Sequence, residues 1–440
     1  MNIFFMSYGC DKNLVDSEKM LGLLSKEGFS LCQSPEDAEV IVVNTCCFID
    51  DAKSESIDGI LEAAAYKNGK CKILAAVGCL AQRYREEIRK EIPEVDVCLG
   101  TGSFELIVDA VKDALKGKNV EIFRNPEDEE IDFSSSRILT TGGYYAYLKI
   151  AEGCDKHCTY CIIPSIKGKY KSVPMEDILR EANDLVKSGV KELILVAQET
   201  TLYGTDLYQK KLLPKLLEEL NKIEDLEWIR LLYCYPEEIT DELIQAIKTL
   251  PKVCHYIDMP IQHSEDRILK KMGRRTSRKD LVEVVEKLRK EIPDICIRTT
   301  LITGFPGETE EEHKGLMDFI DTLEFDRLGV FAYSREEDTP AAEFKDQVSD
   351  EIKERRLDEL MSLQQQIAFD NADRCVGEEL KVLIEGRLPD ENVYVGRTYK
   401  DAPDVDGYIF LNNDRELLSG DFVKARVTGS SEYDLTGEIL

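Results

Sequence analysis

Six apolar strand candidates, separated by amphipathic helical stretches, run through the middle of this 440-residue chain. Alternation of this kind is typical of a parallel α/β sheet. Six such units are two fewer than the eight that close a TIM barrel, so the sequence predicts a partial, open (β/α)6 barrel. The expected strands are Tyr145–Ile150, Glu192–Ala197, Trp228–Tyr233, Tyr256–Met259, Ile295–Ile302 and Arg327–Tyr333, and the helices include Glu176–Lys187, Arg278–Lys290 and Thr309–Leu323.

The sequence divides into three expected domains and a linker. Residues 1–124 alternate strands and helices and predict an N-terminal parallel α/β sheet domain. Residues 125–140, acidic and then Ser-rich, predict a linker. The barrel is expected over residues 141–374 and closes with a long charged helix. Residues 375–440 carry short strands between Gly, Pro, Asn and Asp, which predicts a small antiparallel β-barrel.

The expected elements of the outer domains can be named. In the N-terminal domain the strands are Ile3–Tyr8, Val40–Thr45 and Ile73–Gly78, and helices begin near Asn13, Ala52 and Ala81. The last helix of the partial (β/α)6 barrel is expected over Asp350–Asp373. The strands of the small β-barrel that follows include Lys381–Ile384, Tyr408–Leu411 and Phe422–Thr428.

Composition limits the kinds of partner. The formal charge is −29, from 57 basic and 86 acidic residues, which argues against nucleic acid and favours a basic partner. No apolar run approaches the roughly 18–20 residues of a membrane span, and the first residues do not resemble a signal peptide. We therefore expect a cytoplasmic protein. Its fourteen cysteines are then better explained by metal ligation or catalysis than by disulfides.

Three cysteines are spaced C-x3-C-x2-C directly after the first barrel strand: Cys154, Cys158 and Cys161. Such barrels keep their active sites at the carboxyl ends of the strands. Three thiolates can hold three irons of a 4Fe–4S cluster and leave the fourth iron open. A structural zinc site is the alternative, but zinc normally takes four protein ligands. His157 could be the fourth, although its position next to Cys158 makes that awkward.

Three further cysteines are far apart in the sequence, and each follows an expected strand of the N-terminal domain. They are Cys10, Cys46 and Cys79. The carboxyl ends of parallel strands face one crevice, so these cysteines should converge there. Each alone would more often be a small buried hydrophobe, but together they predict a second cluster. Cys98 also follows a short strand and is a rival ligand.

The three-cysteine spacing, with Tyr160 before its last cysteine, resembles the motif of the radical-SAM superfamily. Nearly the whole chain resembles the radical-SAM methylthiotransferase family, with a TRAM-like barrel at its end. The segments that resemble the RimO branch are GCDKNLVDSEKMLG (Gly9–Gly22), NTCCFIDDA (Asn44–Ala52), AEGCDKHCTYCIIPSIKG (Ala151–Gly168), WIRLLYCYP (Trp228–Pro236) and YVGRTYKDAPDVDG (Tyr394–Gly407).

The resemblance implies an activity and its cofactors. Enzymes of this branch add a methylthio group to the β-carbon of an aspartate in ribosomal protein S-twelve. They use two 4Fe–4S clusters and S-adenosyl-L-methionine, together with an electron donor such as flavodoxin or ferredoxin and a sulfur source. One S-adenosylmethionine methylates a sulfur at the first cluster, and another is cleaved at the second cluster to a radical that abstracts hydrogen. A C–H bond that is not acidic calls for radical chemistry of this kind.

The resemblance also implies site residues. Tyr160 would lie near the adenine of S-adenosylmethionine. The other cofactor-binding positions follow barrel strands two, four and five, and they are Gln198, Glu199, Gln262 and Thr303 within the segment Thr303–Glu308. No catalytic residue beyond the cluster ligands is expected. Two positions depart from the family pattern. Cys47 stands where the family usually has Gly, so either Cys46 or Cys47 could be the cluster ligand. Val173 stands where the family usually has an arginine.

The net charge of the last domain helps to distinguish the RimO branch of the family from its sibling, the MiaB branch. Residues 375–440 contain 14 acidic and 7 basic residues, a net charge of −7. TRAM-type domains of the sibling MiaB branch bind tRNA, and RNA binding calls for Lys and Arg. An acidic barrel would instead attract a basic ribosomal protein, with Asp401, Asp404 and Asp406 among the expected docking charges. A generic solvated acidic surface, tRNA methylthiolation and a non-enzymatic iron–sulfur electron carrier remain the alternatives.

Overall fold

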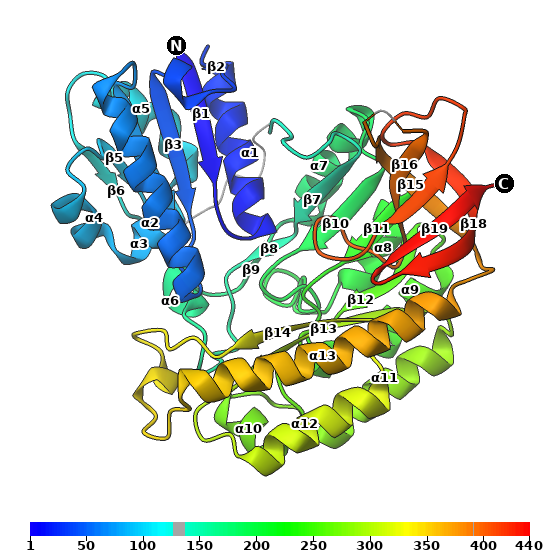
Figure 1. Cartoon of the computed structure of the whole chain (residues 1–440). Helices are drawn as coiled ribbons and strands as arrows, with labels where there is room; N and C mark the ends of the chain where they lie inside the picture. The colour runs from blue at the N-terminus through cyan, green and yellow to red at the C-terminus, as the bar shows by residue number, and fades with distance from the viewer. Residues whose placement is uncertain (126–136, 390) are drawn as a thin grey trace. The chain divides into compact units, whose positions relative to one another are not determined.

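The computed structural model describes residues 1–125, 137–389 and 391–440, which form two compact units (Figure 1). The first unit contains Met1–Thr140, Ala151–Val173 and Ser334–Ala342. The second contains Thr141–Ile150, Pro174–Tyr333 and Glu343–Leu440. Residues 126–136 of the expected linker lie outside the described residues. The segment with the C-x3-C-x2-C spacing, expected within the barrel domain, packs with the N-terminal domain.

The first unit is built on a six-stranded parallel sheet in the order β2-β1-β3-β4-β5-β6. Apolar clusters cover both faces, and β3 is buried along its whole length. The strands are β1 (Asn2–Ser7), β2 (Ser30–Leu31), β3 (Val40–Thr45), β4 (Ile73–Gly78), β5 (Val97–Leu99) and β6 (Val120–Ile122). The helices are α1 (Asp11–Lys26), α2 (Asp50–Ala65), α3 (Cys79–Arg83), α4 (Arg85–Glu91) and α5 (Ile107–Ala114).

Three short elements complete this unit. They are the antiparallel pair β8 (Ala151–Glu152) and β9 (Lys171–Ser172) and the helix α6 (Ile163–Lys167). Ile162 and Ile166, at and near the ends of α6, pack into the same apolar cluster as Cys79 and Leu80. This packing joins the segment that follows β8 to the N-terminal sheet.

The second unit contains a six-stranded parallel sheet whose strands follow chain order, β7-β10-β11-β12-β13-β14. The first and last strands do not pair, so the predicted partial barrel is confirmed. The strands are β7 (Tyr145–Lys149), β10 (Glu192–Val196), β11 (Trp228–Leu231), β12 (Val253–Asp258), β13 (Cys296–Thr303) and β14 (Arg327–Ala332). The helices are α7 (Met175–Lys187), α8 (Leu213–Leu220), α9 (Asp241–Thr249), α10 (Asp266–Lys271), α11 (Arg278–Glu291), α12 (Glu310–Leu323) and α13 (Asp350–Arg374).

Local sequence signals account for two of these helices. Ser277 and Asp280 form a capping box at the start of α11, and Thr309 and Glu312 form one at the start of α12. Each box satisfies backbone N–H groups that have no partner within the helix. The predicted starts of these two helices are therefore correct to within one residue.

The second unit ends in the expected small barrel, which is closed in the strand order β15-β16-β17-β19-β18. Its strands are β15 (Glu379–Arg387), β16 (Val393–Thr398), β17 (Ile409–Asn412), β18 (Phe422–Ser431) and β19 (Asp434–Ile439). Within the described ranges, no helix is long and apolar enough to cross a membrane.

Candidate functional site

The carboxyl ends of β1, β3 and β4 bring Cys10, Cys46 and Cys79 together. The strands are in register, with Ser7 beside Asn44 and Thr45 beside Gly78, so the residues that follow them share one edge. The thiol of Cys79 is buried, which raises its pKa. Lys167 acts in the opposite direction, and the charges of Cys47, Cys46 and Cys10 raise the pKa further. The three cysteines therefore lie close enough to interact electrostatically, and Cys10 is the exposed member.

Asn13 in α1 links the three cysteine loops, a function that the sequence reasoning missed. Its buried amide donates to the carbonyl oxygens of Tyr8 and Thr45, at 3.2 and 2.9 Å. Its Oδ1 accepts from the thiol of Cys79 at 3.8 Å. Since Asn13 lies three residues after Cys10, it could have been found as a polar residue on the first helical turn beyond a candidate ligand.

Cys46 and Cys47 have different surroundings. Gly9 has a positive φ of 88°, and a Cβ there would lie 2.8 Å from the Cys46 sulfur, so the Cys10 loop packs directly on Cys46. Burial raises the pKa of Cys47 to about 12, and Arg83 is the strongest group acting in the opposite direction. Cys46 therefore packs on the Cys10 loop, whereas Cys47 lies against Arg83, and both interact with Cys79.

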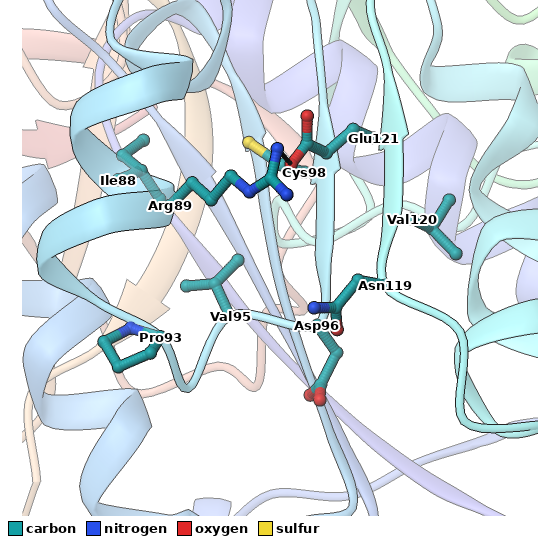
Figure 2. A pocket seen from close by; sticks show the side chains of 9 residues that line it. All are labelled: Ile88, Arg89, Pro93, Val95, Asp96, Cys98, Asn119, Val120 and Glu121. Carbon is teal, nitrogen blue, oxygen red and sulfur yellow. Dashed lines mark ion pairs between the residues drawn. The ribbon is translucent and has the colours of Figure 1, made fainter.

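The rival ligand Cys98 lies away from this edge. In β5 it pairs with Ala76 of β4, three residues before Cys79, which is about 10 Å along a strand. Figure 2 shows Cys98 in a pocket with Arg89 and Glu121, which form an ion pair of 3.3 Å. Burial raises the pKa of Cys98 to about 12.

The second cysteine group lies on a tight loop between β8 and α6. The backbone N–H of Cys154 donates to the carbonyl of Gly168, and that of Cys161 donates to the carbonyl of Cys158, at 3.1 and 3.0 Å. Gly153 has a φ of 78°, and a Cβ there would meet the Lys169 carbonyl oxygen at 2.1 Å, so only glycine fits. Burial raises the pKa of Cys161, and the charges of Cys158 and Cys154 raise it further.

Both cysteine groups therefore belong to the first unit. The segment Ser334–Ala342 ties them together. Buried Glu336 accepts from Arg83, which follows Cys79 in α3, and pairs with Lys53 in α2, at 3.0 and 3.1 Å. At the other end of the segment, the N–H of Ala341 donates to the Thr159 carbonyl, between Cys158 and Cys161.

Four of the five predicted S-adenosylmethionine positions lie at the carboxyl ends of the strands of the second unit. Gln198 and Glu199 follow β10, and Gln262 follows β12 with a φ of 73° and a bridge to Leu301. Thr303 ends β13 and is buried beside Glu308. The fifth, half-buried Tyr160, belongs to the first unit.

The three expected docking acids are structural. Asp401 is buried, pairs with Arg327 at 2.5 Å and accepts from the Thr398 hydroxyl. Asp406 accepts from the hydroxyl of Tyr256 at 2.8 Å, and Asp404 from that of Tyr145 at 3.0 Å. The expectation that these residues dock a substrate is therefore wrong for Asp401 and Asp406, whose side chains are buried. Asp404 is exposed, so a docking role for it stays a prediction. All three contacts attach the small barrel to the six-stranded sheet.

The small β-barrel contacts the amino ends of the strands in the six-stranded sheet of the second unit. Arg327 is the first residue of β14, and Glu192, which pairs with Arg397 of the barrel, is the first residue of β10. The four predicted S-adenosylmethionine positions of this unit, Gln198, Glu199, Gln262 and Thr303, are at the opposite ends of the strands. The eight residues of β13 separate the two edges by about 23 Å.

Each cysteine group supplies three thiolates. Among the described residues, no three His, Cys, Asp or Glu side chains are arranged to hold one metal ion. A single ion needs its sulfur ligands within about 2.3 Å of one point. A 4Fe–4S cluster is larger, because each thiolate binds a different iron, and it takes thiolates alone. Both cysteine groups provide that chemistry.

Three family models match successive parts of the chain. The uncharacterized protein family UPF0004 covers residues 2–100, the radical SAM superfamily covers 148–320, and the TRAM domain covers 376–440. The chain is 58% identical over 99% of both chains to the ribosomal protein uS12 methylthiotransferase RimO of Lachnoclostridium phytofermentans. It is 50% identical over 100% of its length, and 99% of the relative's, to the RimO of Alkaliphilus oremlandii.

Among solved structures, the radical S-adenosylmethionine methyltransferase TsrM from Kitasatospora setae, with cobalamin and a [4Fe-4S] cluster bound, has a TM-score of 0.59 at 13% identity. The match covers 90% of this chain and 80% of that one. The cobalamin-dependent radical enzyme OxsB has a TM-score of 0.54 at 14% identity and covers 83% and 56% of the two chains. These likenesses concern the fold.

The fold and the family matches define a radical-SAM enzyme of the methylthiotransferase class, whose cofactors are 4Fe–4S clusters and S-adenosylmethionine. Within that class, the chain belongs to the RimO family of ribosomal protein uS12 methylthiotransferases. The resemblance that the sequence motifs indicated is thereby confirmed.

Proposed function

We propose that this protein transfers a methylthio group to the β-carbon of an aspartate in ribosomal protein uS12, the S-twelve protein. The observation that carries the proposal is the 58% identity over 99% of both chains to a protein named for that activity. The cysteines at the strand ends of the first sheet and on the β8–α6 loop are consistent with it.

Cys154, Cys158 and Cys161 are proposed to hold the cluster with an open iron. Their loop is short and held by its own backbone hydrogen bonds. Cys154 and Cys158 are buried, which keeps water and oxygen from the bound group. When bound, the cluster and S-adenosylmethionine supply the 5′-deoxyadenosyl radical that abstracts the substrate hydrogen.

Cys10, Cys46 and Cys79 are proposed to hold the auxiliary cluster, at which sulfur is handled. Cys46 is preferred to Cys47 because the Cys10 loop packs on Cys46, while Cys47 faces Arg83. Asn13 positions the three loops through hydrogen bonds. The exposure of Cys10 supports access of an external sulfur source from that side.

Gln198, Glu199, Gln262 and Thr303 are proposed to bind S-adenosylmethionine, with Tyr160 near its adenine. These positions follow from the strand ends of the partial barrel, where such folds bind their ligands. Glu199 is held by the backbone N–H of Thr201 at 2.9 Å, and Gln262 by its bridge to Leu301. The side chain of Glu199 and the backbone of Gln262 are therefore held in place.

The remaining partners follow from the proposed chemistry. Reductive cleavage needs an electron donor such as flavodoxin or ferredoxin, and the product needs a sulfur source. A ribosomal protein substrate places the enzyme in the cytoplasm. The barrel's net charge of −7 favours a basic protein over direct binding of nucleic acid.

The experiment is an anaerobic assay of the reconstituted enzyme with purified uS12 and bulk tRNA side by side, read by mass spectrometry. Methylthiolation of uS12 alone is expected. Modification of tRNA without uS12 would overturn the substrate but keep the methylthiotransferase class. Failure to cleave S-adenosylmethionine would overturn the enzyme class and favour an electron carrier.

A further inference from the structure

Lys167, the last residue of α6, is a buried cation between the two cysteine groups. Its side chain is 5% exposed. A lysine is almost never so deeply buried unless it is paired. It belongs to the segment Ala151–Gly168, but neither cluster ligation nor S-adenosylmethionine binding provides a use for it.

Two carboxylates from different cysteine loops surround the ammonium group. Its Nζ lies 3.1 Å from Oε1 of Glu152, which comes two residues before Cys154. It lies 3.5 Å from Oδ2 of Asp16, which comes six residues after Cys10. Both carboxylates are themselves buried. Lys167 therefore connects the loop of one cysteine group to the helix that follows the other.

The third neighbour is Cys79. The apolar cluster that contains Cys79 and Leu80 also contains Ile166, and the Thr101 hydroxyl donates to the Ile166 carbonyl at 2.9 Å. Lys167 is therefore close enough to Cys79 for the two side chains to interact electrostatically. Burial alone would lower the pKa of Lys167, but the charges of Glu152 and Asp16 outweigh it and keep the ammonium charged.

We propose that Lys167 is a positioning residue that joins the two cysteine loops, and that its positive charge raises the reduction potential of the cluster held by Cys10, Cys46 and Cys79. The inference rests on the cluster assignment made in the proposed function. A fixed positive charge in a buried, low-dielectric environment favours the state with one more electron, because little solvent screens it. Cluster potentials depend on net charge and surroundings in this way.

The test uses full-length protein in which Cys154, Cys158 and Cys161 are replaced by Ala, so that only the auxiliary cluster is loaded. Its midpoint potential is measured by anaerobic titration with dithionite, followed by electron paramagnetic resonance. Lys167→Met is compared with Lys167→Arg, which keeps the charge. Lys90→Gln is the matched control, because it removes a positive charge from the exposed surface of the same unit.

Lys167→Met also removes a cation from beside two buried carboxylates, so the comparison is repeated in an Asp16→Asn, Glu152→Gln background. In that background the carboxylates are neutral, so the comparison isolates the charge of Lys167 from its ion pairs. In both backgrounds Lys167→Met is expected to lower the reduction equilibrium constant about tenfold, which is about 59 mV for one electron. Lys167→Arg and Lys90→Gln should leave the potential unchanged.

The outcomes separate the two claims. If the starting protein binds no iron, the ligand assignment fails and the inference falls with it. The second case is that iron is bound, but Lys167→Met and Lys167→Arg have the same midpoint potential in the Asp16→Asn, Glu152→Gln background. Lys167 then does not tune the cluster, and only the inference is overturned.

Discussion

Glu192 and Arg397 form an ion pair of 2.8 Å in which neither side chain has any exposed surface. Glu192 begins β10 of the six-stranded sheet, and Arg397 lies in β16 of the small barrel. Glu192 also pairs with Arg230 of β11 at 2.7 Å. Burial alone would raise the pKa of Glu192, but Arg397 and Arg230 lower it below its ordinary value. The barrel is thus attached to the sheet by buried charges.

Replacing Glu192 by Ala should destabilise the protein by about 3–5 kcal/mol, because buried Arg230 loses its carboxylate and buried Arg397 keeps only Glu385. The measurement is chemical denaturation followed by circular dichroism. Glu227→Ala is the control, since Glu227 pairs with Lys381 at the exposed surface, and it should change stability by less than about 0.5 kcal/mol. Equal effects of the two substitutions would show that the buried pair does not hold the barrel.

The assignment of the second cysteine group is tested by iron content. Replacing Cys154, Cys158 and Cys161 by Ala should leave about four irons per chain, the content of one 4Fe–4S cluster. Cleavage of S-adenosylmethionine should be lost, because no open iron remains to bind it. Iron analysis and detection of 5′-deoxyadenosine make the measurement. Surviving cleavage would refute the assignment.

The auxiliary group is tested by separating two activities. Replacing Cys10, Cys46 and Cys79 by Ala should preserve S-adenosylmethionine cleavage and abolish methylthio transfer to uS12. Cys47→Ala is the matched control, because Cys47 neighbours Cys46 but lies against Arg83. It should keep the iron content of the wild type, whereas Cys46→Ala should lose iron. The reverse result would make Cys47 the ligand.

Glu308, beside Thr303, predicts a pH dependence of stability. Burial raises the pKa of Glu308 to about 7, against the opposing charge of Arg356. The folded state then binds more protons than the unfolded state between about pH 4.5 and 7, so this carboxyl lowers stability as pH rises through that range. The difference between about 7 and 4.5 corresponds to about 3 kcal/mol.

Glu308→Gln should remove this contribution. The variant's stability relative to the wild type should therefore increase from pH 5 to pH 8, by up to about 3 kcal/mol. Denaturation at several pH values measures it. His263 and His313 lie 3.9 and 3.8 Å from the Glu308 carboxylate, so the measured pH dependence is that of this coupled group, of which Glu308 is the member removed. A difference that does not vary with pH would show that Glu308 titrates in its ordinary range.

The exposed acidic residues of the small β-barrel, rather than the buried acids that attach it to the sheet, should dock the basic substrate. Glu416 and Glu432 are exposed. Glu416→Lys with Glu432→Lys should weaken capture of uS12 at low salt and less at high salt, because exposed charges are screened. Asp401→Lys is the contrasting variant, since it should destabilise the protein by about 3–5 kcal/mol by breaking its pair with Arg327. Unchanged capture by the surface variant at low salt would exclude docking there.

Local patterns in the sequence determined much of this protein. The alternation of strands and helices predicted the open six-stranded sheet, and the short spacing of Cys154, Cys158 and Cys161 predicted one cysteine loop. Cys10, Cys46 and Cys79 could be grouped because parallel strands end at one edge. These inferences succeed because periodicity and strand direction follow from the backbone over short stretches of chain.

The tertiary structure decided what depends on packing between distant segments. It gave Cys46 and Cys47 different surroundings, although they are adjacent in the sequence. It buried Lys167 between two cysteine loops, and it used Asp401 to attach the barrel, where charge counting predicted docking. Composition and spacing do not record which charges become buried and paired, because that depends on long-range register and on the surfaces that meet when the chain folds.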